Sequence, residues 1–263
     1  FVDPAILERP QLYDVIVDAR EGKGGGQSIS VKLTPSGSSL SPPAAVAREV
    51  AKALEAVPPA ASTQEVAAIM RLAQETRTPI VPMGGNTGVT GATQARDAVI
   101  LSTERLDRIR EIRTQARVAV AEAGVVVATL QEAVAAQGLT FPLMFGARGS
   151  ARIGGVLSTN AGGANVLRYG NTRALCLGLE AVLPDGRVMD LTSALLKDNS
   201  GYDLRQLLIG AEGTLGVITA AALRLFPRPA ETGTAVMVVR DPDAALDLLA
   251  LAGDIAGSGI NAF

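Results

Sequence analysis

Three stretches of the sequence combine glycine with short hydrogen-bonding side chains, a composition suited to binding phosphate. They cover residues 84–88 (Gly-Gly-Asn-Thr-Gly), 149–163 and 210–219. Because glycine has no Cβ, backbone N–H groups in such turns approach the oxygens of a pyrophosphate closely. Asn86 and Thr87 add short side-chain donors to the first stretch. We therefore expect residues 84–88 to hold a dinucleotide's pyrophosphate, with a tight hairpin that binds no ligand as the alternative.

The second and third stretches have structural alternatives of their own. Residues 149–163 concentrate Gly, Ser, Thr and Asn beyond what folding requires, and glycine costs backbone entropy, so this density indicates a site. A plain glycine-rich connection is the alternative there. Residues 210–219 join a tight turn to a β-branched run, and a turn followed by a strand, without a ligand, is the alternative.

Histidine is absent from the sequence, which narrows the chemistry available to the chain. Its absence excludes Ser-His and Cys-His triads, histidine-containing zinc sites and the commonest general base. The single cysteine, Cys176, lies in an apolar run, so we expect a buried structural thiol, with a reactive thiol as the alternative.

The charge balance favours a small-molecule partner. Lys and Arg number 24 against 26 Asp and Glu, which provides no basic field for nucleic acid or a membrane surface. With 263 residues, 48% of them hydrophobic, the chain is long enough for one large or two modest globular domains. We find neither a spanning apolar run nor a signal pattern, and so expect a cytoplasmic or matrix-type compartment.

Helix and strand patterns position the three stretches without a regular βαβ repeat. Ser62 and Glu65 form a capping box, and the apolar face of the helix they begin runs through Val66 to Ala73. A hairpin is predicted over residues 179–191, around Pro-Asp-Gly. The remaining predicted elements are strands at 79–81, 99–102, around 118–120 and at 235–239, and helices at 125–136, closed by Gly138, and at 242–252.

Residues 1–59 carry the weakest patterns. Residues 22–26 and 34–43 are interpreted as loops, and 44–56 as a short amphipathic helix through Val46, Val50 and Leu54. The Gly-Lys pair within residues 22–26 is no phosphate loop, because that motif requires Ser or Thr directly after the lysine.

The three stretches belong to longer motifs that occur in a fixed order. These motifs read Pro-Met-Gly-Gly-Asn-Thr-Gly at 82–88, Gly-Gly-Val-Leu-Ser-Thr-Asn-Ala-Gly-Gly at 154–163 with Arg-Tyr-Gly-Asn at 168–171, and Lys-Asp-Asn-Ser-Gly-Tyr-Asp-Leu at 197–204 before 210–219. Together they resemble the FAD-binding, PCMH-type domain of the vanillyl-alcohol oxidase superfamily, within it the D-2-hydroxyglutarate and D-lactate dehydrogenase group. The resemblance covers about residues 59–229 and implies no architecture for residues 1–58.

The resemblance implies an α+β fold of two α/β subdomains with FAD between them, not a Rossmann sheet. Residues 82–88 would hold the pyrophosphate, 142–162 would follow the flavin and ribityl chain, and 212–218 would lie by the nucleotide half. Noncovalent FAD is expected because no histidine is present to attach it. Asn199, Tyr202 and Asp203 are interpreted as internal packing and hydrogen-bonding residues. The implied cofactor-binding residues are Pro82, Met83, Gly84, Gly85, Asn86, Thr87, Gly88, Pro142, Gly149, Ser150, Gly154, Thr159, Asn160, Gly162, Glu212, Gly213, Gly216, Val217 and Ile218.

The implied activity is oxidation of a D-2-hydroxy acid, with hydride passing to flavin N5. In the family, the carboxylate-binding arginine and the active-site histidines come from a cap domain, so we name no catalytic residue and no metal ligand here. We expect a fragment in which residues 230–263 begin a truncated cap domain. The expected partners are a 2-hydroxy acid and an unidentified electron acceptor, with a homodimer left open. The alternatives are an FAD-binding or electron-transfer subunit without its own substrate site, and a degenerate member without flavin.

Overall fold

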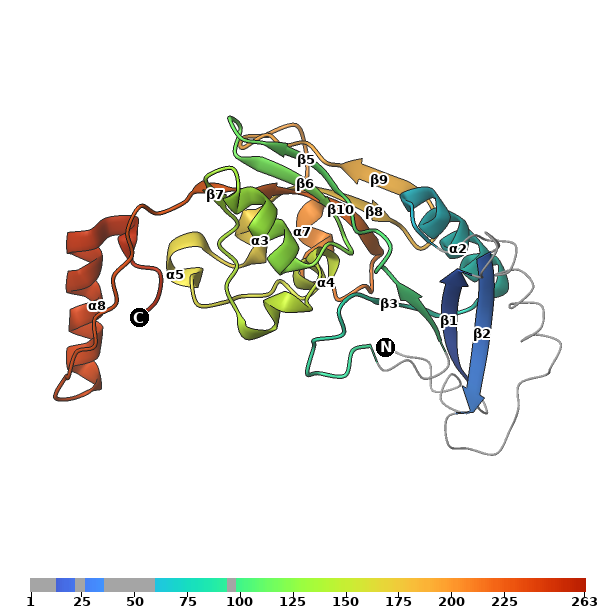
Figure 1. Ribbon diagram of the computed structural model, residues 1–263, viewed down its shortest axis with the longest axis horizontal. Coiled ribbons are helices and arrows are strands. Elements are labelled where there is room, and N and C mark those ends of the chain that lie inside the picture. Colours follow the sequence, from blue (N-terminus) through green and yellow to red (C-terminus); the bar gives the residue numbers. More distant parts are fainter. Residues whose placement is uncertain (1–12, 22–26, 36–59, 94–97) are drawn as a thin grey trace.

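Two β-sheets, of four and five strands, form the framework of the chain, and a third sheet has only two strands (Figure 1). The computed structural model describes residues 13–21, 27–35, 60–93 and 98–263. Its strands are β1 (Tyr13–Glu21), β2 (Gln27–Pro35), β3 (Ile80–Met83), β4 (Val99–Ser102), β5 (Ile109–Arg113), β6 (Val118–Glu122), β7 (Leu139–Thr140), β8 (Cys176–Val182), β9 (Val188–Leu191), β10 (Val217–Arg224) and β11 (Phe226–Pro227). Its α-helices are α2 (Thr63–Thr76), α3 (Val127–Ala135), α4 (Ile153–Ser158), α5 (Val166–Tyr169), α6 (Thr172–Leu175), α7 (Arg205–Leu208) and α8 (Pro242–Ala256).

The smaller sheet has the strand order β2-β1-β4-β3. Strands β1 and β2 are antiparallel, with Val17 opposite Val31, whereas β1 and β3 both run parallel to β4. Neither β1 nor β2 was predicted, although Ser-Ile-Ser-Val-Lys-Leu in β2 alternates with the period of a strand. The loop predicted at 34–43 is therefore corrected at Thr34 and Pro35, which end β2. The predicted helix at 44–56 lies outside the described residues.

The larger sheet has the order β5-β6-β10-β8-β9, with antiparallel neighbours throughout. Alternate residues of β6 point to one face, where Ala119 and Ala121 join a core built with α3, α4, α6 and α7. In β10 every residue from Val217 to Leu223 is buried, so this strand is covered on both faces. The predicted hairpin is confirmed, with Val182 opposite Val188.

Helix α2 connects the two sheets. Val66, Ile69 and Met70 on its apolar face pack with Leu101 of β4 and Val182 of β8. The predicted cap at its first turn is confirmed, since Ser62 Oγ accepts a 3.3 Å hydrogen bond from the N–H of Glu65. The Glu65 carboxylate reaches one residue further than in the standard capping box and accepts from the N–H of Ala61.

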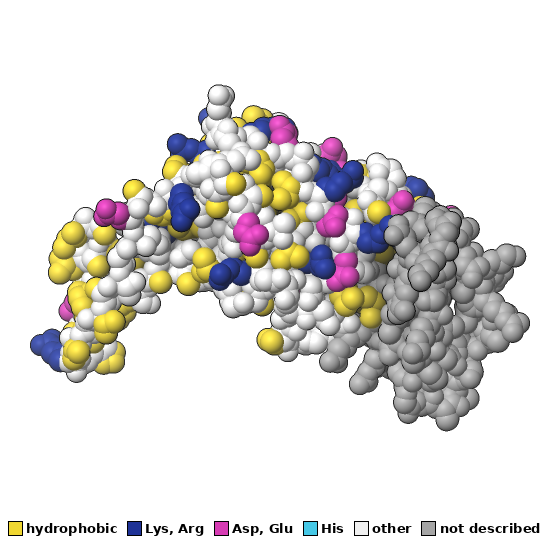
Figure 2. Space-filling model, viewed as in Figure 1, with side chains coloured by type: hydrophobic (Ala, Val, Ile, Leu, Met, Phe, Trp, Pro, Cys, Tyr) yellow, Lys and Arg dark blue, Asp and Glu magenta, His cyan; other side chains and the backbone are white. Residues whose placement is uncertain are grey.

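Residues 228–263 extend away from the sheets and include α8, after which the chain turns back, as Figure 1 shows. The predicted helix at 242–252 is confirmed and runs on to Ala256. The predicted strand at 235–239 is wrong, because this segment pairs with no other strand among the described residues and leaves Val236 and Val238 94% and 100% exposed. A β-branched run forms a strand only where a neighbouring edge accepts its hydrogen bonds. Figure 2 shows hydrophobic side chains along this arm.

Candidate functional site

The three glycine-rich stretches converge on one cavity of about 470 Å³. It lies where the chain leaves β3, where α4 begins, and where β10 begins. Fourteen of the residues expected at the cofactor line it: Pro82, Met83, Gly84, Gly85, Asn86, Thr87, Gly88, Gly154, Thr159, Glu212, Gly213, Gly216, Val217 and Ile218. Stretches that are separated by up to about 130 residues in sequence therefore form one wall.

The first stretch offers backbone donors to the cavity. Within the described part of the chain, the N–H groups of residues 84–88 donate to no other protein group. Asn86 adopts the left-handed conformation (φ 50°), and its side-chain oxygen accepts a 2.6 Å hydrogen bond from Thr93 Oγ1. Residues 86–88 are exposed, so their N–H groups are open to water or to a ligand in the cavity. This loop therefore has the chemistry of an anion-binding turn.

Glycine is required at two close approaches in this wall. A Cβ on Gly85 would lie 1.9 Å from the carbonyl oxygen of Ser150, which places the first stretch directly against the second. A Cβ on Gly154 would lie 2.7 Å from the Cβ of Ala123, because α4 packs tightly against the segment after β6. A substitution at Gly85 would therefore disrupt the contact between the stretches before it reached any ligand.

The third stretch is joined to both of the others. The N–H of Glu212, a residue in the left-handed conformation (φ 51°), donates to the carbonyl of Ser158 at 2.9 Å. Gly213 follows with φ 81°, and a Cβ there would lie 3.1 Å from the ring of Pro82. These contacts fix the turn before β10 against the end of β3 and the end of α4.

Five expected site residues lie outside the cavity lining: Pro142, Gly149, Ser150, Asn160 and Gly162. The carbonyl of Pro142 accepts from Asn165 Nδ2 at 2.9 Å, and Asn160 Oδ1 accepts from the N–H of Arg173 at 3.0 Å. A Cβ on Gly162 would lie 2.9 Å from Asn171 Oδ1. These contacts serve the local fold, so a direct role of the five residues at the cofactor stays a prediction.

Sequence reasoning missed several residues of the cavity wall. Gly155 and Arg152 lie inside the second stretch, and Thr103 follows β4 directly. Because β3 and β4 are parallel, their carboxyl ends meet at one edge, which is a signal that places Thr103 beside Met83. The further lining residues that were not predicted are Val89, Thr90, Ala92, Thr93, Phe145, Ala147, Ala151, Val156, Ser158 and Ala161.

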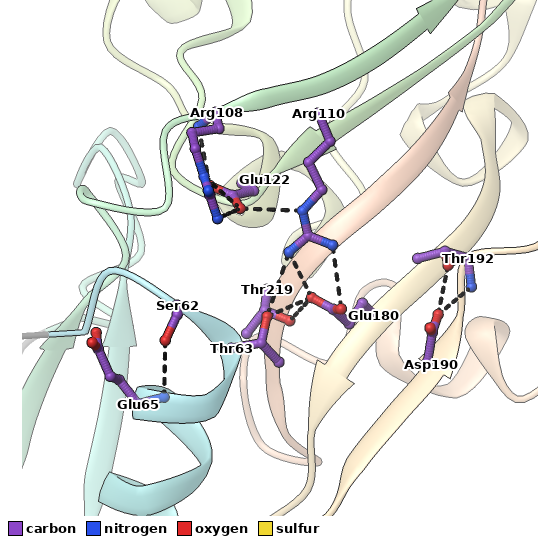
Figure 3. A network of polar contacts seen from close by, with 10 residues as sticks. All are labelled: Ser62, Thr63, Glu65, Arg108, Arg110, Glu122, Glu180, Asp190, Thr192 and Thr219. Carbon is purple, nitrogen blue, oxygen red and sulfur yellow. Dashed lines mark hydrogen bonds and ion pairs between the residues drawn. The ribbon is translucent and has the colours of Figure 1, made fainter.

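A network of charged groups lies outside the cavity, where α2 meets the larger sheet (Figure 3). Arg110 bridges two carboxylates, with Nε 3.1 Å from Glu122 and Nη2 3.0 Å from Glu180. Thr63 of α2 and Thr219 of β10 both donate to Glu180, at 2.6 and 2.7 Å. The network therefore connects the first turn of α2 to four strands of the larger sheet, β5, β6, β8 and β10.

Both carboxylates of this network are charged at neutral pH. Burial alone would raise the pKa of Glu122, but hydrogen bonds from Arg108 and Arg110 outweigh burial and hold that pKa below its usual value. Burial likewise raises the pKa of Glu180, but hydrogen bonds from Arg110, Thr63 and Thr219 outweigh burial, so this pKa is also lowered.

The structure settles two further expectations about single residues. Cys176 is buried, and burial raises its thiol pKa to about 12, which confirms the structural thiol over the reactive one. Tyr202 is 97% exposed, so its interpretation as a packing residue is wrong. Asn199 and Asp203 are exposed as well, which overturns their expected packing, but the Asp203 carboxylate does hydrogen-bond within the chain, accepting from Arg205 at 2.7 and 2.6 Å.

Two kinds of site are not found in the described part of the chain. No group of three or more His, Cys, Asp or Glu residues there is placed to hold a metal ion. No described helix combines the length and the apolar character that crossing a bilayer demands.

The residues of the cavity fit a dinucleotide such as FAD. Besides the unpaired N–H groups of residues 84–88, a Cβ on Gly88 or Gly155 would meet no protein atom within 4 Å, so both positions leave open space. Arg152 adds a cation whose buried Nε has no hydrogen-bond partner. Open backbone, free donors and positive charge are what a diphosphate requires.

The mixed α+β fold and the glycine-lined cavity thus define a nucleotide-binding class of domain. The chain belongs to the FAD binding domain family, whose model matches residues 55–192. The expected α+β class and the expected resemblance are both confirmed.

The relatives extend well beyond this chain. It is 47% identical over 177 residues to D-2-hydroxyglutarate dehydrogenase, mitochondrial, of Bos taurus, a match covering 67% of this chain and 32% of the relative. It is 43% identical over 187 residues to D-lactate dehydrogenase of Archaeoglobus fulgidus, covering 71% of this chain and 42% of the relative. Among solved structures, alkyldihydroxyacetonephosphate synthase shares the fold with a TM-score of 0.58 at 24% identity, over 66% of this chain and 31% of that one. The chain spans about a third to two fifths of the length of these relatives.

Proposed function

We propose that this chain binds FAD noncovalently in the cavity between its two sheets and forms the FAD-binding part of a D-2-hydroxy-acid dehydrogenase. The observation that carries this proposal is the convergence of the three glycine-rich stretches on one wall with unpaired backbone donors. Noncovalent binding is supported because the described lining residues include no His, Cys or Tyr side chain.

Each stretch takes a separate part of the dinucleotide in this proposal. The N–H groups of residues 84–88 hold the diphosphate. The wall at Gly154, Gly155 and Thr159 lies along the flavin and its ribityl chain, and residues 212–218 lie by the nucleotide half through their backbone. The tight contacts at Gly85 and Gly213 support this assignment, because they hold the wall rigid before a ligand arrives.

The proposed reaction is oxidation of a D-2-hydroxy acid to the 2-oxo acid. When bound, FAD supplies the hydride acceptor for this oxidation. The names of the bovine and archaeal relatives support a substrate similar to 2-hydroxyglutarate or lactate. The protein's part is to hold the dinucleotide in a fixed orientation and to shield it from water.

The groups that bind the substrate carboxylate are proposed to lie outside this cavity. Among the described lining residues, Arg152 and Glu212 are the only charged ones, and Arg152 lies against the proposed diphosphate loop. We propose residues 59–229 as the FAD domain and 230–263 as the beginning of a substrate domain. The same observation favours a second function, an FAD-binding or electron-transfer subunit whose substrate site another polypeptide supplies.

Absorbance of the purified chain between about 350 and 500 nm tests the proposal, followed by denaturation and analysis of the released flavin. We expect flavin bands and complete release of FAD. A folded chain that is colourless and takes up no added FAD would overturn the proposal. Turnover of D-2-hydroxyglutarate or D-lactate, with a dye as electron acceptor, separates the dehydrogenase from the subunit.

A further inference from the structure

Arg152 is the only cation among the described residues that line the cavity. It is the N-terminal capping residue of α4, and its side chain is 17% exposed. The only carboxylate of the lining, Glu212, comes from the opposite side of the wall, in the turn before β10. Among the described lining residues, Arg152 therefore provides the positive charge that a ligand in the cavity would meet.

The hydrogen bonds of Arg152 leave its guanidinium incompletely paired. Nη1 donates to the carbonyl of Gly124 at 2.6 Å, and Nη2 donates to Glu104 at 3.0 Å. The third nitrogen, Nε, is buried without a partner. A buried donor without a partner is energetically costly, so a movement that pairs it is favourable.

The partner carboxylate of Arg152 is easily exchanged. The Glu104 side chain is 55% exposed, so water and salt screen its ion pair with Arg152, and the pair contributes little to stability. The bond to Gly124 holds the guanidinium near the wall, while the bond to Glu104 restrains its other end only weakly. A doubly charged ligand in the cavity would compete with Glu104 for this end.

The stem of Arg152 lies against the first glycine-rich stretch. A Cβ on Gly84 would be 3.5 Å from the Cβ of Arg152. The guanidinium and the unpaired N–H groups of residues 84–88 thus serve the same region of the cavity. Arginine pairs with phosphate through two parallel hydrogen bonds, which Nε and one Nη provide together.

We propose that Arg152 binds the diphosphate of the dinucleotide, exchanging Glu104 for a phosphate oxygen and pairing its Nε in the bound state. The assignment rests on the proposed function. The ligands that Arg152 would bind are nucleotides that carry a diphosphate. Arg152 has no proposed role toward the flavin ring.

Titration of the flavin-free full chain with FAD, ADP and riboflavin tests the proposal, using flavin fluorescence and calorimetry. Arg152→Gln should weaken binding of FAD and ADP by about tenfold or more, with a smaller dependence on salt, because one charged contact to phosphate is lost. Riboflavin, which has no phosphate, should bind as to the unmodified chain. Arg187→Gln is the matched control, because Arg187 is 77% exposed and outside the lining, and it should leave all three affinities unchanged.

A second variant keeps the test decisive if Arg152→Gln does not fold. Glu104→Gln frees the guanidinium from its competing carboxylate and should tighten ADP binding by about two- to fivefold. The assignment would be overturned if Arg152→Gln weakened the binding of FAD and of riboflavin equally, or if neither variant changed the affinity for ADP. If the unmodified chain bound no FAD, the proposed function would fail and this assignment with it. If the chain bound FAD and Arg152→Gln left that affinity unchanged, the assignment would fail but the proposed function would stand.

Discussion

The cavity and the charged network differ in whether their polar groups are paired, although both include residues of β10. Val217 and Ile218 line the cavity, whereas the hydroxyl of the next residue, Thr219, belongs to the network. In the network the carboxylates of Glu122 and Glu180 are each paired with arginine, whereas the N–H groups of residues 84–88 donate to no group in the described part of the chain. The paired charges of the network stabilise the fold, whereas the N–H groups of residues 84–88 are accessible to a ligand. The comparison therefore separates residues that stabilise the fold from residues that bind a ligand.

The largest effect is expected from removing the Glu122 carboxylate, whose side chain is fully buried. Glu122→Ala should lower the free energy of unfolding by about 3 kcal/mol, because Arg110 would keep its partly buried charge with one partner fewer. Urea denaturation measures the loss. Glu111→Gln, which breaks an exposed ion pair with Arg113, is the control and should change stability by no more than about 0.5 kcal/mol. A loss below about 1 kcal/mol for Glu122→Ala would contradict the structural role of the network.

The second test fills the cavity without touching the network. Gly155→Leu places a side chain in open space beside the cavity and should weaken FAD binding at least about tenfold while changing the unfolding free energy little. Gly253→Leu in α8 is the matched control, since it also adds a side chain at an open helical glycine away from the cavity. Flavin titration and thermal unfolding measure the two properties. Unchanged FAD affinity in Gly155→Leu would remove this wall from the proposed site.

The smallest test uses pH. The pKa values of Glu122 and Glu180 are lowered in the folded chain, so their stabilising contribution is present above about pH 4.5, the ordinary value, and is lost as pH falls through the folded pKa values. Unfolding measured from pH 7 down to pH 3 should show this loss. Glu180→Gln should lose less stability than the unmodified chain over the same interval. Parallel curves for the two proteins would show that this carboxylate does not titrate with folding.

Local signals predicted the parts of the fold that depend on neighbouring residues. The cap at Ser62 and the hairpin around residues 184–186 follow from residue types at short spacing. The convergence of the glycine-rich stretches on one cavity was implied only by the family resemblance, because up to about 130 residues separate them. The network was not predicted, because Thr63 and Glu180 are 117 positions apart and Arg110 and Glu180 are 70 apart, and no periodicity joins residues at such distances.

The remaining errors arise from tertiary context. The apolar run at 235–239 has a strand's composition, but no strand among the described residues pairs with it. The expected roles of Pro142 and Asn160 at the cofactor stay predictions, because their polar atoms bond to Asn165 and Arg173 and a motif alone does not say which way a residue faces. Arg152 was overlooked because its role depends on which donor of its side chain is left unpaired.

Strand β10 also limits which sequences this fold tolerates. Ala220, Ala221 and Ala222 are fully buried, so even a few added methylene groups would overpack the strand and cost about 1–3 kcal/mol. In a saturation library, positions 220–222 should therefore accept fewer substitutions than the exposed residues 195–203, although no chemistry has been assigned to the alanines. Related sequences would diversify around this strand while keeping its small side chains.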